Sequence, residues 1–154
     1  MSVPAGTIER LDSELKEALK AKDDLKVSVI RMIKASLKNK SIEKMSALTD
    51  DDILSVLSHF AKQRRESIEQ FTAAGRTDLA GKEEKELQIV RTYLPQQLSP
   101  QEIDDIIRSA ISECGASSPN DMGKVMKIVS PKTKGTADGK IVSQRVKELL
   151  SSHP

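Results

Sequence analysis

The stretch YLPQQLSPQE, which runs from Tyr93 to Glu102, decides how the chain is divided. Pro95 and Pro100 interrupt the helical pattern, because proline lacks a backbone N–H and the residue before it avoids the helical conformation. Ser99 is followed three residues later by Glu102, which is the pattern of a helix-capping box, and Pro100 suits the first helical position. We therefore expect one helical block to end before this stretch and a second block to begin within it.

Apolar residues on both sides of this stretch recur at intervals of three and four, and no convincing strand alternation occurs. The periodicity predicts an all-α fold, with an N-terminal four-helix part followed by a C-terminal three-helix domain. The expected domains are residues 1–94 and 100–154, with residues 95–99 as a linker. In the first block, one helix is expected to begin near Thr7 and a second after Lys22–Leu25. A third runs from a cap at Thr49 to Gly75, and a fourth from Thr77 toward Leu94. In the second block, one helix runs from Ser99 to Gly115, and two more begin after caps at Ser118 and Asp138.

The composition limits the class of protein. The chain has 154 residues, of which 37% are hydrophobic, 31% charged and only 2% aromatic, a balance that favours helices over sheets. The formal net charge is +2, which by itself does not indicate nucleic-acid binding. The single cysteine, Cys114, excludes an intramolecular disulfide and suits a reducing compartment. Because the N-terminal residues lack the apolar core of a secretory signal and no apolar run approaches a membrane span, we expect a soluble, cytoplasmic protein without a membrane partner.

Residue types that carry catalysis are scarce. Of the two histidines, His59 stands in an amphipathic segment, where we interpret it as a structural or surface residue, and His153 stands next to the C-terminus. Cys114 lies near a helix C-terminus, the wrong end of the dipole for a thiolate, so we interpret it as a buried or half-buried small residue. Capping and solvation explain the carboxylates. No Cys and His spacing suits a metal, and we expect no catalytic residue, no metal site and no cofactor.

Positive charge is concentrated near the end of the chain. Between Met122 and Lys147 the only acid is Asp138, whereas acids on the preceding helix balance the total charge. The cations of this segment are Lys124, Lys127, Lys132, Lys134, Lys140, Arg145 and Lys147. Lysines are point charges on flexible stems, which suit contact with a phosphate backbone, and glycine amides would add to such contact. We therefore predict a phosphate-binding surface made of Lys124, Lys127, Lys132, Lys134, Gly135, Gly139, Lys140 and Lys147.

The loop in this segment, SPKTKGTADGK from Ser130 to Lys140, is expected to connect two helices. An alternative without binding stays open: Gly123 would allow close helix packing, Gly135 would make a turn, and the lysines would only keep the domain soluble. The lack of interleaved aromatic residues disfavours stacking on single-stranded bases.

Two more basic segments stand in the first block. In FAKQRRESIEQF, Phe60 to Phe71, Glu66 and Glu69 lie at helical spacing from the cations, so we expect a solvated face whose charges pair within the helix. The cations of that segment are Lys62, Arg64 and Arg65. One stripe of the second expected helix is also basic and consists of Arg31, Lys34 and Lys38.

Three longer segments carry a resemblance to a known family. They are RMIKASLKNKSIEK at residues 31–44, AKQRRESIEQFTAAGRTDLAGKEEKELQIVRTYLPQQLS at residues 61–99, and GASSPNDMGKVMKIVSPKTKGTADGKIVSQRVKELL at residues 115–150. In this order they resemble the YqeY family, over about residues 8–150. The resemblance implies an all-α fold with an N-terminal four-helix part and a C-terminal three-helix part.

The same resemblance implies a link to transfer RNA. The C-terminal part is similar to the tail domain of the GatB subunit of the glutamine-dependent amidotransferase, which converts Glu or Asp mischarged on tRNA to Gln or Asn. That tail domain contacts the tRNA and carries no chemistry. The similarity rests on DMGKVM, Asp121–Met126, and KGTADGK, Lys134–Lys140. Two positions depart from the family: Lys127 replaces a small residue, and Ser130 replaces a Met, which keeps the basic character and loses one apolar contact.

These implications give the expected function. We expect a non-catalytic tRNA-binding accessory in aminoacyl-tRNA metabolism, with tRNA and an aminoacyl-tRNA synthetase or amidotransferase as partners. A carbon–nitrogen ligase label with glutamine as amide donor would reach the chain only through the tail-like domain. Two alternatives stay open, namely a protein-interaction adaptor with no RNA role and an amide-transfer accessory that is active only in a complex.

Overall fold

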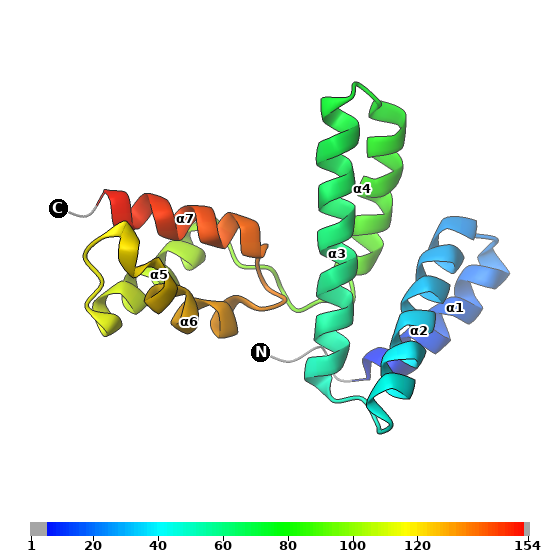
Figure 1. The fold of residues 1–154 in the computed structure, drawn as a ribbon. Helices are drawn as coiled ribbons and strands as arrows, with labels where there is room; N and C mark the ends of the chain where they lie inside the picture. Colours follow the sequence, from blue (N-terminus) through cyan, green and yellow to red (C-terminus); the bar gives the residue numbers. More distant parts are fainter. Residues whose placement is uncertain (1–5, 153–154) are drawn as a thin grey trace. The chain divides into compact units, whose positions relative to one another are not determined.

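The computed structural model describes residues 6–152, and these residues form helices and no strand (Figure 1). The predicted all-α class is confirmed. The α-helices are α1 Thr7–Ala21, α2 Asp24–Lys44, α3 Asp50–Ala73, α4 Thr77–Arg91, α5 Pro100–Cys114, α6 Met122–Thr133 and α7 Gly139–Ser151, and a short 3₁₀-helix, η1, spans Pro119–Asp121.

The chain divides into two compact units, and the division follows Pro95. Helices α1 to α4 form the N-terminal unit, and α5, η1, α6 and α7 form the C-terminal unit. Two hydrogen bonds attach the chain just after the division to the C-terminal unit. The Gln97 side-chain nitrogen donates to the Gly135 carbonyl at 2.9 Å, and the Leu98 amide donates to the Thr136 carbonyl at 2.8 Å. The limits of the domains and of the linker stay predictions.

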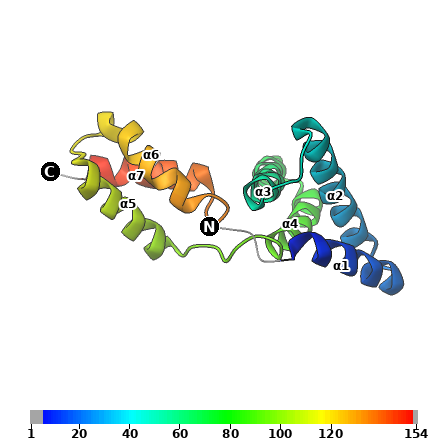
Figure 2. The same ribbon diagram turned by 90° about the horizontal axis from the view of Figure 1, so that it is seen from below.

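In the N-terminal unit, α3 and α4 form a long antiparallel hairpin, and α1 and α2 pack near one end of it (Figure 1). Figure 2 looks along the hairpin and shows α1 and α2 on one side of α3. Local signals explain two of the helix starts. Asp23 accepts a hydrogen bond from the Lys26 amide at the start of α2, and Thr49 and Asp52 form a reciprocal capping box at the start of α3. The fully buried side chains of this unit include Leu11, Ile30, Ile33, Leu54, Leu57, Leu87 and Tyr93.

Tyr93 joins the end of the N-terminal unit to α1. Its ring is fully buried, its hydroxyl donates to the Glu14 carboxylate, and the Arg10 guanidinium lies 4.7 Å from the ring centroid. Arg10 also donates to the Thr92 carbonyl at 3.0 Å. Burial and the bond to Glu14 raise the pKa of the Tyr93 hydroxyl. Burial of Glu14 acts to raise its pKa too, but Tyr93, Arg10 and Lys26 outweigh it, and the net pKa of this carboxyl is lowered.

Arg64 does not lie on the solvated face that the sequence predicts. Its side chain is 12% exposed, and its Nε lies 3.4 Å from Oε2 of Glu86 on α4, whose side chain is 10% exposed. Its guanidinium also lies 5.1 Å from the ring centroid of Phe60, and its Nη2 lies 3.8 Å from Sδ of Met32. The prediction of pairing within the helix is therefore wrong for Arg64. Spacing along one helix identifies neighbours on that helix only, and it cannot reveal a partner on an adjacent helix.

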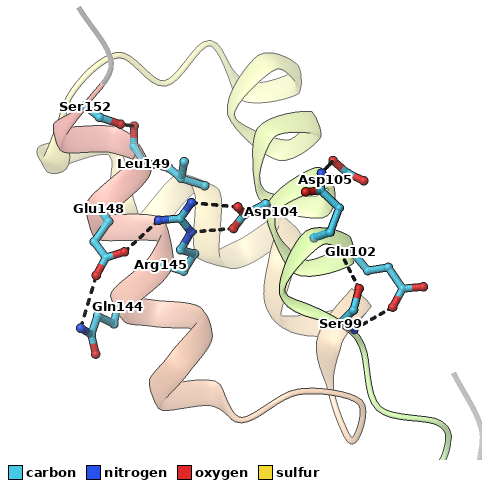
Figure 3. Close-up of polar contacts among 10 residues, drawn as sticks. Ser99, Glu102, Asp104, Asp105, Gln144, Arg145, Glu148, Leu149 and Ser152 are labelled. Carbon is cyan, nitrogen blue, oxygen red and sulfur yellow. Dashed lines mark hydrogen bonds and ion pairs between the residues drawn. The ribbon is translucent and has the colours of Figure 1, made fainter.

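In the C-terminal unit, α5, α6 and α7 enclose a small apolar core. Ser99 and Glu102 form the predicted capping box at the start of α5 (Figure 3), and Gly115 ends that helix with a φ of +66°. Asp138 caps α7 by accepting a hydrogen bond from the Lys140 amide at 3.0 Å. The buried core residues include Ile103, Ile107, Ala110, Val125, Val129, Val142, Val146 and Leu150.

Two local predictions, and one part of the alternative without binding, need correction. Helix α4 ends at Arg91, three residues before the expected Leu94, because the next amides donate to carbonyls three residues back and tighten the last turn. Ser118 caps η1 rather than α6. Gly123 does not mediate close helix packing, since it is exposed and an added Cβ would meet no heavy atom within 4 Å from elsewhere in the described residues.

Candidate nucleic-acid interface

The connection between α6 and α7 is shorter than the sequence predicts. Helix α6 continues through Pro131 to Thr133, so only residues 134–138 lie between the two helices. Pro131 removes one helical donor, but the Thr133 side chain is buried and its hydroxyl donates to the Val129 carbonyl at 3.1 Å, which holds the last turn in place. Lys132 therefore lies on the last turn of α6 and not in a loop.

Lys124 and Lys127 lie on the solvent-facing side of α6. Residues three apart share a helix face, and the buried Val125 and Val129 mark the side that faces the core. The Lys124 side chain is 69% exposed, and its ammonium lies 3.6 Å from the Asp121 carboxylate. An exposed contact of this kind contributes little to stability, so a polyanion could displace it at small cost.

Gly135 makes the turn after α6. Its φ of +77° lies in the left-handed region that favours glycine, and its carbonyl accepts the hydrogen bond from Gln97. Thr136 is buried, and its hydroxyl donates to the Thr133 carbonyl at 3.0 Å. These contacts fix the turn on which the exposed Lys134 stands. Sequence reasoning missed Gln97, because no local pattern distinguishes a side chain that binds a backbone carbonyl 38 residues away.

Lys140 and Lys147 stand seven residues apart on α7, so they share one face, and both are exposed. Arg145 stands two residues before Lys147 and lies on another side of the helix, where it donates to both carboxylate oxygens of Asp104 on α5 at 2.6 and 2.8 Å (Figure 3). It also donates to Glu148 at 2.9 Å. The hydrogen bonds to Asp104 and Glu148 raise the pKa of Arg145, and the bond from Arg145 lowers the pKa of Asp104. Arg145 therefore joins α7 to α5 and adds little to the positive surface.

The described part of the C-terminal unit thus exposes six lysines on α6, α7 and the turn between them, and these lysines together are called the basic surface below. Its members are Lys124, Lys127, Lys132, Lys134, Lys140 and Lys147. Gly139, the remaining predicted residue, is exposed at the first position of α7. The arrangement offers several cations on flexible stems to an extended anion. Contact of these residues with phosphate stays a prediction.

The other residues considered for chemistry lie apart from the basic surface. His59 is exposed on α3, and Cys114 is half-buried against the core of the C-terminal unit, as expected for a small core residue. His153 lies outside the described residues. Within residues 6–152, no group of three or more His, Cys, Asp or Glu side chains is arranged to hold a metal ion.

Comparison with known proteins identifies the family. A family model described as Yqey-like protein matches residues 8–150, which is nearly the whole chain. The chain belongs to the YqeY-like family. The expected YqeY resemblance is therefore confirmed, whereas this match by itself contains no statement about tRNA or amide transfer.

Three fungal relatives of this YqeY-like chain share the name Altered inheritance of mitochondria protein 41, mitochondrial. The protein from Vanderwaltozyma polyspora is 39% identical over 67% of this chain and 57% of its own length. The protein from Lachancea thermotolerans is 36% identical over 74% of this chain and 63% of its own length. The protein from Pyrenophora tritici-repentis is 30% identical over 94% of this chain and 81% of its own length. The chain therefore spans less than two thirds of the first two relatives.

These names contradict the cytoplasmic prediction, because they assign the relatives to mitochondria. The cytoplasmic prediction is wrong on this comparison. It rested on the lack of a secretory signal core, and mitochondrial transit peptides, which are amphipathic and rich in Arg, lack such a core as well. Over residues 6–152, no helix is long and apolar enough to cross a membrane.

Proposed function

We propose that this YqeY-like chain is a non-catalytic tRNA-binding accessory in aminoacyl-tRNA metabolism, and that its C-terminal unit contacts the phosphate backbone. The observation that supports the proposal is the basic surface: six lysines are exposed, while the nearby Arg145 is neutralised by Asp104 and Glu148. The similarity of DMGKVM and KGTADGK to a tail domain that contacts tRNA supports tRNA as the polyanion.

The proposed contact uses charge and shape rather than base reading. Phe60, Phe71 and Tyr93 are the aromatic residues of the whole chain, and all of them precede Pro95. The C-terminal unit therefore has no Phe, Tyr or Trp on which an unpaired base could stack. Lysine ammonium groups on flexible stems match phosphate oxygens without strict geometry, so the proposed binding favours structured RNA broadly over one short sequence.

The proposed protein partner is an aminoacyl-tRNA synthetase or a glutamine-dependent amidotransferase. In such a complex the chain would supply binding, and a carbon–nitrogen ligase label with glutamine as donor would describe the partner. The mitochondrial names of the relatives support a test with mitochondrial tRNA as well as total tRNA.

The test measures tRNA affinity of the full chain by filter binding at several salt concentrations. The double variant Lys132→Glu with Lys134→Glu reverses two charges of the basic surface. The control, Lys16→Glu with Lys20→Glu, makes the same change in charge on exposed positions of α1. Each lysine that no longer neutralises a phosphate should lower the slope of log affinity against log salt by about 0.7 to 0.9. We expect the first variant to lose affinity about tenfold or more and to have a shallower slope, and the control to keep most of its affinity.

Circular dichroism of each variant ensures that the comparison is made between folded proteins. Equal tRNA affinity of the two double variants would contradict the assignment of the basic surface. A wild-type chain that binds no tRNA at low salt would contradict the proposed function as a whole.

A further inference from the structure

The N-terminal unit carries an apolar groove that the proposed RNA contact does not use. The groove has a volume of about 290 Å³ and lies between the first turns of α1, the second half of α2 and the loop that follows α2. Its apolar lining consists of Ile8, Leu11, Leu37 and Leu48. Leu11 and Leu37 are buried core residues, whereas Ile8 is 41% exposed and Leu48 is half-buried. Water therefore contacts apolar surface that a partner could cover.

Two further exposed apolar side chains stand at the end of α2. Ile42 is 64% exposed and Met45 is 90% exposed, and they stand one and four residues after Ser41, which lines the groove. Ile42 also stands four residues after Lys38 on the same stripe of α2. Single exposed apolar residues are common on protein surfaces, so these two add to the argument only by their position close to the groove in sequence.

Positive charge lies along the α2 side of the groove, where Lys34 and Lys38 line it. Residues 31–44 of α2 contain five cations and one acid, Glu43. Two of the cations already contact carboxylates: Lys34 lies 2.5 Å from Asp12, and Lys44 lies 2.5 Å from Asp52. Lys38 lines the groove and is exposed. A carboxylate arriving with an apolar side chain would therefore meet Lys38 and could share Lys34 with Asp12.

We propose that this groove binds a helical segment of a partner protein in which one or two large apolar side chains stand beside Asp or Glu. The apolar side chains would pack against Ile8 and Leu48, and the carboxylates would contact Lys38. The combination of an apolar groove with a basic rim selects such a segment, because an apolar segment alone would leave the lysines unused and an acidic segment alone would leave the groove hydrated. The proposal is independent of tRNA binding, since the groove and the basic surface belong to different units.

The shape of the site favours a protein segment over a lipid surface. A membrane-surface helix presents a broad apolar face, whereas α2 turns its main apolar face, with Ile30, Ile33 and Leu37, into the core. The remaining apolar surface is a groove with two adjacent side chains, Ile42 and Met45. A groove of this size accepts individual side chains, and a flat bilayer cannot enter it.

The experiment selects partners without assuming a sequence. A displayed library of random helical peptides is selected on the full chain, and binders that also bind the Ser41→Arg variant are removed. Ser41 is half-buried in the groove, and an arginine there would occupy the space that a ligand needs. Synthetic versions of the enriched peptides are then titrated by fluorescence polarisation against wild type, Lys38→Glu, Ile8→Ser and the control Lys20→Glu, which changes the same charge on an exposed position of α1.

We expect the enriched peptides to combine Leu, Ile, Met or Phe at helical spacing with Asp or Glu. Lys38→Glu should weaken their binding about tenfold, Ile8→Ser should weaken it several-fold, and Lys20→Glu should change it less than twofold. Circular dichroism confirms that each variant is folded. Ile8→Ser removes an exposed side chain, so it provides a second test should Ser41→Arg disturb the fold.

Several results would overturn the proposal. One is that no enriched peptide depends on the groove, and another is that the enriched peptides are basic or uncharged. A third is flotation with vesicles of phosphatidylcholine and phosphatidylglycerol that is lost in Ile42→Ser with Met45→Ser, which would identify a lipid surface as the ligand. A fourth is a dimer in sedimentation that disappears in Ser41→Arg, which would identify a second copy of the chain.

Discussion

Removal of the Glu86 charge is expected to destabilise the N-terminal unit by about 3 kcal/mol. The Arg64 and Glu86 side chains are 12% and 10% exposed, and the two charged groups lie 3.4 Å apart. At this distance their attraction is about 5 kcal/mol for an effective dielectric constant of about 20. Desolvation of the carboxylate offsets part of this energy, and an open hollow of about 310 Å³, lined by Arg64 and Glu83, lets water approach the guanidinium. Glu86→Gln keeps the shape of the side chain and leaves the cation largely buried without its counter-charge.

The single tyrosine provides an assay that is specific to this unit. The chain has one Tyr and no Trp, and Tyr93 is buried in the core of the N-terminal unit. Tyrosine emission during urea unfolding therefore reports this unit and not the C-terminal one. We expect Glu86→Gln to lower the urea midpoint without changing the slope. Glu17→Gln, which removes the same charge from an exposed position of α1, should stay within about 0.5 kcal/mol of wild type.

A double-mutant cycle separates the ion pair from simple packing. Arg64→Met with Glu86→Leu removes both charges and keeps apolar volume, so it should cost less than the sum of the two single changes. Unfolding of Glu86→Gln at the wild-type urea midpoint would contradict a stabilising ion pair, and so would single changes Arg64→Met and Glu86→Leu whose effects add without coupling. Either result would mean that water already solvates Arg64 in the folded state.

Three further changes test other contacts. Tyr93→Phe removes the donor to Glu14 and should destabilise the N-terminal unit by about 1.5 kcal/mol, seen as faster amide hydrogen exchange in α1 and α4. Ser99→Ala removes the cap of α5 and should cost the C-terminal unit about 1 kcal/mol, seen as faster exchange in α5 alone. The bond from Arg145 lowers the folded-state pKa of Asp104. This pair therefore stabilises the C-terminal unit fully above the unfolded-state pKa of about 4. The stabilisation is lost as the pH falls through the lower, folded-state pKa. Asp104→Asn should therefore make the C-terminal unit less stable at neutral pH, and its stability should fall less steeply as acid is added. The amide NMR signals of α5 and α7 during an acid titration measure this.

The features that the sequence predicted well depend on neighbouring residues. The capping box of Ser99 and Glu102, the cap at Thr49 and the helix end at Gly115 are formed by residues three or four apart, and the order of residues along the chain contains all the information they need. The extent of α6 was predicted less well, because the loop was expected to begin at Ser130, whereas the helix continues to the buried Thr133.

The features that the sequence did not predict depend on residues far apart in the chain. Arg145 counts among the cations near Lys147, yet its partner Asp104 stands 41 residues earlier. Arg64 likewise finds Glu86 on the next helix. A count of charges in a segment gives the cations available to a ligand only after the cations that hold helices together are removed. In the C-terminal unit Arg145 is such a cation, because it joins α7 to α5.

The basic stripe of α2 suits a different class of ligand. The basic stripe of Arg31, Lys34 and Lys38 would suit a phosphate backbone as well as the lysines of α6 do, if charge were the only criterion. The stripe differs because it borders a groove lined by large apolar side chains, and a phosphate backbone would leave that groove hydrated. The basic surface of the C-terminal unit consists of exposed lysines on two helices and a turn. The two proposed sites thus differ in ligand, a polyanion for one and an acidic, apolar protein segment for the other, and a chain that binds both would tether one to the other.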